Sequence, residues 1–187
     1  MTSGLLVADV QAGITRAFEF CQPMLPTLVD VVDQARQAEI EVLFAVCAMR
    51  PSGADQSPRN HVMAPFFALA DVFHEGGPGP EVDPRLRRRE TEPVITKRRV
   101  SAFQSSELDL VLRSRGVTEL AIAGIATSAV VLASALDAVD LDYGVTVLSD
   151  CCADPDSDVH EFLLSRVFPG RGVAVSSGGS WLRSAAE

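Results

Sequence analysis

The sequence predicts an α/β fold with a parallel β-sheet of about six strands and helices on both faces. Short apolar segments alternate along the chain with amphipathic or small-residue segments of helical length. Such alternation is typical of parallel strands joined by right-handed helical crossovers. The apolar segments are also nearly continuous, as expected for strands that are buried on both faces. We therefore expect three layers, with the sheet in the middle.

The first half of the chain begins this alternation. Residues 5–10 form a short apolar run with Asp9 at its carboxyl end, which predicts the first strand. Residues 24–39 keep their apolar side chains on one stripe and their acids outside it, so they predict an amphipathic helix. The apolar run at 40–48 predicts the next strand.

Residues 50–93 interrupt the alternation. They hold seven of the eleven prolines, and their one apolar stretch, at 62–73, is compatible with a helix. Loops of this length are uncommon inside compact domains unless they are functional. We therefore expect residues 50–93 to form an insertion or a lid within a single domain that spans residues 1–187.

The second half resumes the alternation. A short strand at 93–96 is followed by Lys97, and a helix is expected at 105–115, with Ser105 as its N-cap and Gly116 as its stop. The remaining elements follow in order: a strand at 119–124, a helix at 127–141, a strand at 144–150, a helix at 157–167 and a strand at 173–177.

Composition limits the possible partners. The formal net charge of −9 opposes binding to nucleic acid and to anionic membranes. The basic run 85–89 is short and is closed by Glu90, so we expect it to be solvated. No apolar segment is long enough to cross a membrane, and no secretory signal is expected at the start.

The cysteines and histidines suggest neither disulfides nor metal. Cys151 and Cys152 are adjacent and cannot readily bridge each other, so we expect Cys21, Cys47 and this pair to be free thiols in a reducing cytoplasm. The three histidines are far apart in the sequence, and neither a metal nor another cofactor is expected.

Candidate site residues lie where the predicted strands end. Ligands of open parallel sheets bind outside the carboxyl ends of the strands. Asp9, Lys97, the turn at 124–130 and Asp150 all fall at such ends. An acid, an ammonium and a helix N-terminus in one crevice can shift each other's pKa values and stabilise an oxyanion. We therefore expect a pocket for a small molecule there.

Five short segments, taken in order, resemble a known family. They are LLVADVQ at 5–11, VITKRRVSAF at 94–103, AGIATSAVV at 123–131, ALDA at 135–138 and VTVLSD at 145–150. In sequence and spacing they resemble the isochorismatase-like, or cysteine hydrolase, family over nearly the whole chain. The resemblance implies a Rossmann-like fold and a triad of Asp, Lys and Cys that acts on amides, ureido compounds or related substrates.

The resemblance also implies roles for individual residues. Asp9 matches the acid or base, and Lys97 matches the positioning cation. Ala126 and Val130 match the residues whose backbone N–H groups form the oxyanion hole, and a cis peptide is expected just before Ala126. The position of the family cysteine is occupied by Val130.

Valine at this position excludes thiolate attack from it, because an isopropyl group has no lone pair. Ser128 could in principle replace the missing nucleophile. However, it lies two residues before the family position, and no histidine is near it in the sequence to act as its base. Some family members that hydrolyse isochorismate or similar vinyl ethers also lack the cysteine, and their aspartate is thought to protonate the substrate. That chemistry needs Asp9 to be partly protonated near neutral pH, which burial favours and Lys97 opposes.

Two hypotheses follow. The first is a hydrolase that acts on a small metabolite by acid/base chemistry, and the second is an inactive member that serves as a ligand-binding or oligomeric scaffold. Either way, Gln11, Phe103 and Asp150 match positions that line or support the family pocket, and Thr127 is expected to cap the following helix. Members are commonly homodimers or higher homo-oligomers, and the small-residue stretch 128–138 is a candidate contact.

Overall fold

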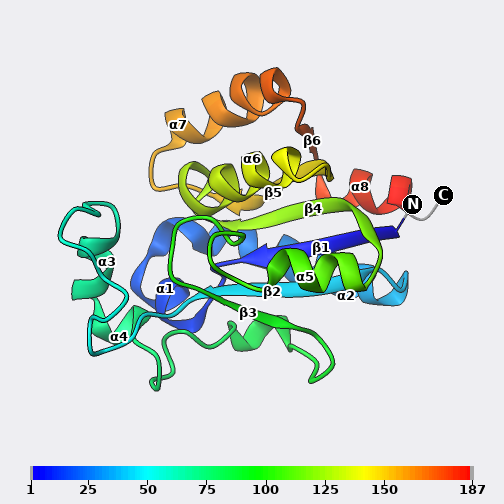
Figure 1. Cartoon of the computed structure of the whole chain (residues 1–187). Coiled ribbons are helices and arrows are strands. Elements are labelled where there is room, and N and C mark those ends of the chain that lie inside the picture. The colour runs from blue at the N-terminus through cyan, green and yellow to red at the C-terminus, as the bar shows by residue number, and fades with distance from the viewer. Residues whose placement is uncertain (1, 186–187) are drawn as a thin grey trace.

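The computed structural model describes residues 2–185 and contains a six-stranded sheet in the order β3-β2-β1-β4-β5-β6 (Figure 1). All neighbouring strands are parallel. The strands are β1 (Thr2–Ala8), β2 (Glu41–Cys47), β3 (Val94–Lys97), β4 (Val117–Ile125), β5 (Gly144–Ala153) and β6 (Ala174–Ser176). The order reverses between β1 and β4, so a crevice is expected at their carboxyl ends.

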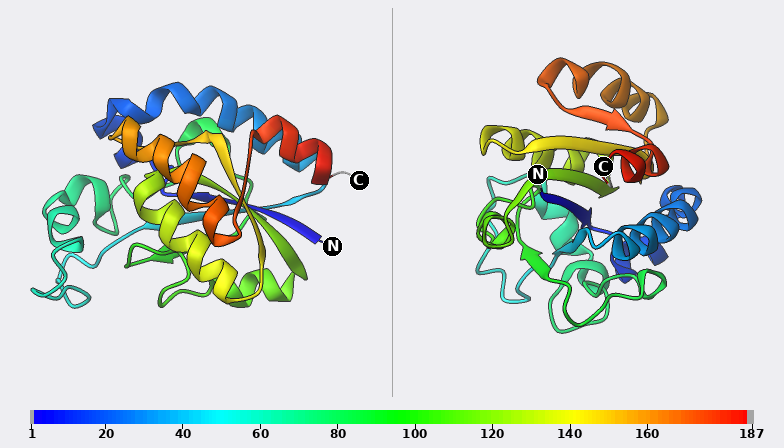
Figure 2. Two further views of the ribbon diagram at one scale, coloured as in Figure 1. Left: turned by 90° about the horizontal axis from the view of Figure 1, so that it is seen from above. Right: turned by 90° about the vertical axis from the view of Figure 1, so that its right-hand side faces the viewer.

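Helices cover both faces of this sheet, as Figure 2 shows. One face packs against α1 (Ala12–Ala17), α2 (Leu25–Gln37) and α8 (Gly178–Ala185), and the other against α5 (Leu108–Ser114) and α6 (Leu132–Asp140). Beyond α6 lie α7 (Ser157–Phe162) and a π-helical turn at Leu163–Val167, and short 3-10 turns occur at Glu19–Met24, Pro84–Leu86 and Pro169–Arg171. Each face has its own apolar core, which confirms the predicted three-layer α/β fold. No helix within residues 2–185 is long and apolar enough to cross a membrane.

Several helix boundaries differ from the prediction. Ser105 does not cap α5; it has a φ of 56°, and the helix begins three residues later, where Ser106 Oγ accepts the N–H of Leu108 at 3.2 Å. Gly116, with a φ of 68°, does follow the end of α5. The helices α1 and α8 were not predicted, because α1 is short and α8 begins with two glycines.

Strand β5 is longer than predicted, and this changes the place of Asp150. The register of β4 and β5 shifts, from Ile122 opposite Val147 to Gly124 opposite Cys152, so β5 continues past Asp150 to Ala153. The Asp150 carboxylate accepts the N–H of Gly178 at 2.7 Å, at the start of α8. Asp150 therefore lies within a strand rather than at its end.

Residues 50–93 pack against the carboxyl ends of β1 and β2. The stretch 62–73 forms two helices, α3 (Met63–Ala68) and α4 (Ala70–Phe73), which lie to one side of the sheet in Figure 1. Bridges join Met49 to His74 and Gln11 to Val82. These contacts fix the segment at two points and leave α3 and α4 beside the crevice.

Candidate active site

An ion pair between Asp9 and Lys97 lies at the carboxyl edge of the sheet. Asp9 directly follows β1, and Lys97 is the last residue of β3, with β2 between these strands. Lys97 Nζ lies 2.8 Å from Asp9 Oδ2. Lys97 is only 2% exposed and Asp9 only 7% exposed. The structure thus brings together two residues that lie far apart in the sequence, as expected from the strand ends.

Burial dominates the electrostatics of Asp9. Desolvation raises the pKa of the Asp9 carboxyl, and the charge of Lys97 opposes this shift without cancelling it. Lys97 Nζ also donates a hydrogen bond to Arg99 O at 3.0 Å. Asp9 Oδ1 is buried and has no hydrogen-bond partner among residues 2–185. One carboxylate oxygen therefore binds the ammonium, and the other is buried without a hydrogen-bond partner.

The turn after β4 forms the other side of this crevice. It contains a cis peptide between Ile125 and Ala126, at the place that the resemblance implied, and continues as a π-helical turn over Thr127–Val131. Gly124 has a φ of 151°, and a Cβ there would lie 2.1 Å from Ala8 O. Only glycine allows β4 to approach β1 so closely at this point.

Gln11 and Thr127 connect this edge to neighbouring elements. Gln11 Oε1 accepts the N–H of Cys47 at 2.9 Å, and its Nε2 donates to Cys47 O at 3.2 Å and to Val72 O at 3.0 Å. Thr127 Oγ1 donates to Ala153 O at 3.2 Å and lies 2.8 Å from His160 Nδ1. The predicted N-cap role of Thr127 is wrong, because its side chain bonds to β5 and α7 instead of the turn's own N–H groups.

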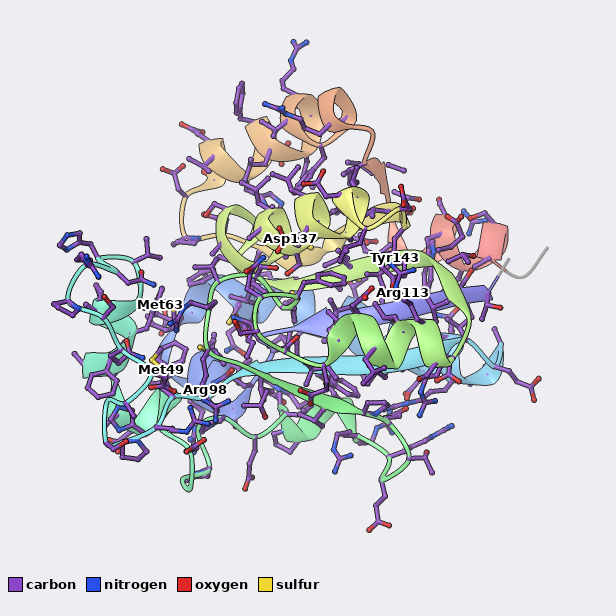
Figure 3. All side chains as sticks on the ribbon, viewed as in Figure 1. Met49, Met63, Arg98, Arg113, Asp137 and Tyr143 are labelled. Atoms are coloured by element: carbon purple, nitrogen blue, oxygen red, sulfur yellow. The ribbon has the colours of Figure 1, made fainter. Side chains whose placement is uncertain are left out.

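A pocket of about 340 Å³ opens over these groups. Its charged lining residues are Asp9 and Lys97, and the turn contributes Ala126, Ser128 and Val130. The rest of the lining is mostly apolar and comprises Ile14, Phe18, Phe20, Cys47, Met63, Phe66, Phe73, Val100, Ile125, Ala129 and Pro155. Figure 3 shows Met63 on α3. This apolar wall has no signal in the sequence, since its side chains come from separate segments with no common motif.

Comparison with known proteins gives the family. Residues 3–178 match the model of the isochorismatase domain. The chain belongs to the isochorismatase family. A probable inactive nicotinamidase of Arabidopsis thaliana is 32% identical over 165 residues, which cover 84% of each chain. An uncharacterised isochorismatase family protein of Bacillus subtilis, YwoC, is 27% identical over 173 residues, 89% of this chain and 86% of the relative.

Solved structures share the fold. An isochorismatase family protein from Desulfovibrio vulgaris superposes with a TM-score of 0.87 at 27% identity, covering 100% of this chain and 99% of that protein. The likeness thus extends over the whole isochorismatase domain, including the strand ends that hold Asp9 and Lys97.

Phe103 and Asp150, two further expected site residues, lie away from the pocket. Phe103 lines a separate hollow with Asp109 and Asp137. Its ring centroid is 6.0 Å from that of Tyr143, and Figure 3 labels Asp137 and Tyr143. Asp150 contacts α8 as described above. Phe103 lies in the segment between β3 and α5, and Asp150 lies within β5, which extends past its predicted end.

No metal centre is evident in the described part of the chain. Within residues 2–185, no group of three or more His, Cys, Asp and Glu side chains converges in a way that could hold an ion. His160 is nevertheless a site neighbour that sequence reasoning missed, because only the packing of α7 brings it to the turn.

Proposed function

We propose that this isochorismatase family member is a hydrolase of a small metabolite, with a vinyl ether, amide or related bond as the target, and that it works by acid/base chemistry. The observation that carries the proposal is the buried Asp9–Lys97 pair, whose free oxygen Asp9 Oδ1 faces no protein partner within residues 2–185. Burying an ion pair is costly in free energy, and such pairs cluster at functional sites.

Asp9 is the proposed proton carrier. Its raised pKa makes the protonated form accessible closer to neutral pH than for an ordinary Asp. With a vinyl ether, Asp9 gives its proton to the alkene carbon, and water adds to the resulting oxocarbenium carbon. The water proton returns to Asp9, and the hemiketal then separates into a ketone and an alcohol. Lys97 holds the carboxylate in place and stabilises its charged form between the two steps.

The proposed mechanism uses no thiol nucleophile at position 130, because this residue is Val130. It is buried in the turn where the family cysteine is expected, and its isopropyl group cannot attack an acyl carbon. For an amide substrate, Asp9 would instead activate water, and the N–H groups of Ala126 and Val130 are the proposed donors to the oxyanion.

A catalytically inactive, ligand-binding or oligomeric scaffold is the second candidate. Val130 favours it, as does the similarity to a relative named as a probable inactive nicotinamidase. The mostly apolar lining of the pocket also suits a protein that binds a ligand without reaction.

Turnover of a substrate panel separates the two candidates. Purified protein is assayed with isochorismate and with neutral vinyl ethers, amides and esters, beside Asp9→Asn and Lys97→Met. The hydrolase proposal expects activity that falls by about 10²-fold or more in Asp9→Asn. Activity that is unchanged in Asp9→Asn, or no turnover of any panel member, would sink it and favour the scaffold.

Val130→Cys tests the geometry of the turn. If the turn has the hydrolase arrangement, the new thiol is activated by Asp9 and forms an acyl adduct with an activated ester, which mass spectrometry locates at position 130. Val131→Cys is the matched control, since it places a buried thiol one residue away on the same turn. Equal labelling of both variants would contradict the proposed geometry.

We also propose a homodimer or higher homo-oligomer in a reducing cytoplasm. All four cysteines are free, which fits a reducing compartment. Light scattering after size-exclusion chromatography gives the oligomeric state, and a monomer at micromolar concentration would refute the proposed homo-oligomer.

A further inference from the structure

Cys47 lies in the same pocket as Asp9 and Lys97. It is the last residue of β2, directly opposite Lys97 in the register of β2 and β3, and it lines the pocket. Its 3% exposure is close to the 0–5% of Cys21, Cys151 and Cys152, none of which is among the described lining residues. The four thiols are therefore equally buried, and access through the pocket distinguishes Cys47.

The surroundings of Cys47 are fixed and charged. Gln11 holds the backbone of Cys47 through both its N–H and its C=O, so the backbone that carries the thiol is fixed. The charges of Lys97 and Asp9 both act on the thiol. Asp9 Oδ1 is a buried oxygen without a partner among residues 2–185, and the Asp9 residue lines the same pocket as Cys47.

We propose that Cys47 is a covalent-modification site for small, neutral, apolar electrophiles that enter this pocket, with Asp9 accepting the thiol proton. The modification depends on the pocket and on Asp9, and not on turnover of any substrate.

The lining determines the class of electrophile. Phe18, Phe20, Phe66 and Phe73 contribute aromatic rings to the wall, and the ammonium of Lys97 is already bound to Asp9 and to Arg99 O. A carboxylate on the reagent would lose its hydration without gaining a free cation, which is costly in free energy. An α,β-unsaturated amide with an aromatic group fits this chemistry.

The proposed step is a conjugate addition in which all atoms are retained. The thiol proton moves to the ionised Asp9 carboxylate, and a sulfur lone pair forms a bond to the terminal alkene carbon. The electrons of the carbon–carbon double bond shift to form an enolate, which takes the proton back from Asp9 at the adjacent carbon. Nothing is released, and the adduct fills the pocket.

Burial makes the reaction selective. It raises the pKa of the Cys47 thiol to about 12, so free thiolate is scarce at neutral pH and a soluble reagent that stays outside the pocket does not react. Reaction requires both occupancy of the pocket and a nearby base. None of the other three cysteines lines this pocket, and Cys151, whose thiol contacts Asp150 Oδ1 at 3.6 Å, therefore has a base but no such access.

The test uses N-phenylacrylamide as the neutral electrophile and its 4-carboxylate analogue as the matched anion. The folded protein is treated with each reagent, digested, and mapped by mass spectrometry. We expect a single adduct at Cys47 with a rate that saturates with reagent concentration, and at least about tenfold slower reaction of the anion. N-phenylpropanamide, which lacks the alkene, should protect Cys47 by occupying the pocket.

Variants assign the roles. Cys47→Ser should remove the adduct, whereas Cys21→Ser should leave it unchanged. Asp9→Asn should slow the reaction by about 10²-fold if Asp9 is the base. Adducts spread over all four cysteines, no adduct at Cys47, or no protection by N-phenylpropanamide would each overturn the proposal, and the protection experiment needs no variant that might fail to fold.

Discussion

The pocket has two contrasting walls. The wall at the carboxyl edge of the sheet carries the charged side chains, and its backbone has no space for a larger residue at Gly124. The wall formed by residues 63–73 carries apolar side chains on two short helices. On the sheet side, Asp9 and Lys97 are buried and bonded, and Gly124 lies against the backbone of Ala8. On the helical side, Phe66 is half-buried and packs edge-on against Phe73, with ring centroids 5.3 Å apart. We infer that the sheet wall determines the chemistry and the helical wall determines what can enter.

The largest expected effect is that of Gly124→Ala. The new Cβ would lie 2.1 Å from Ala8 O, so β1 and β4 would have to separate in the middle of the sheet. We expect loss of more than about 4 kcal/mol of unfolding free energy, or no folded protein. Gly76→Ala is the control, because Gly76 also has a positive φ of 90° but nothing within 4 Å of its added Cβ.

That control should cost only about 1–2 kcal/mol, the strain of alanine in a left-handed conformation. Urea denaturation of both variants measures the difference. Similar losses of unfolding free energy in the two variants would show that an added methyl group is accepted as well at Gly124 in the sheet as at Gly76 in its loop.

Lys97→Met should have the next largest effect, and it should depend on pH. The pKa of Asp9 is raised in the folded chain, so the folded state binds more protons than the unfolded one between the ordinary and the raised value. Stability therefore falls as pH rises through this window and then levels off. Loss of Lys97 raises the pKa of Asp9 further, which extends the window to higher pH.

Above that window we expect Lys97→Met to cost about 3–5 kcal/mol, because it leaves a buried charge without a partner. Below it, where Asp9 is protonated, the cost should be much smaller. The double variant Asp9→Asn/Lys97→Met removes both charges and should regain stability at high pH. Urea titrations across pH check this, and a loss independent of pH would contradict the role of Asp9.

The smallest effect is expected for Arg98→Gln, beside the helical wall. Arg98, labelled in Figure 3, pairs with Asp55 at 2.9 Å and with Glu75 at 2.7 Å, and so joins the end of β3 to residues 50–75. These pairs are partly exposed, so the global unfolding free energy should change by at most about 1 kcal/mol.

Amide hydrogen exchange in residues 50–62 should nevertheless become faster in Arg98→Gln, since local opening loses these contacts. Arg113→Gln is the matched control, because it removes an exposed pair with Asp109 on α5, far from the pocket in sequence. Unchanged exchange in residues 50–62 would show that Arg98 does not hold this wall in place.

Sequence alone determined the elements whose signals are local. Apolar runs predicted the six strands, and the carboxyl ends of β1 and β3 identified Asp9 and Lys97, because parallel strands end at one edge of a sheet. The turn at 124–130 followed from the predicted strand end, and its cis peptide followed from the resemblance to the family. The sequence does not determine the direction of the Asp9 pKa shift, because burial and Lys97 oppose each other.

Tertiary structure decided everything that depends on contacts between distant segments. Burial in the folded chain raises the pKa of Asp9, and folding places Cys47 and the aromatic side chains in one pocket with Asp9. A register shift in β5 moved Asp150 away from the edge, and packing of α7 brought His160 to Thr127. Neither has a local sequence signal, because register and helix packing depend on the summed fit of many side chains.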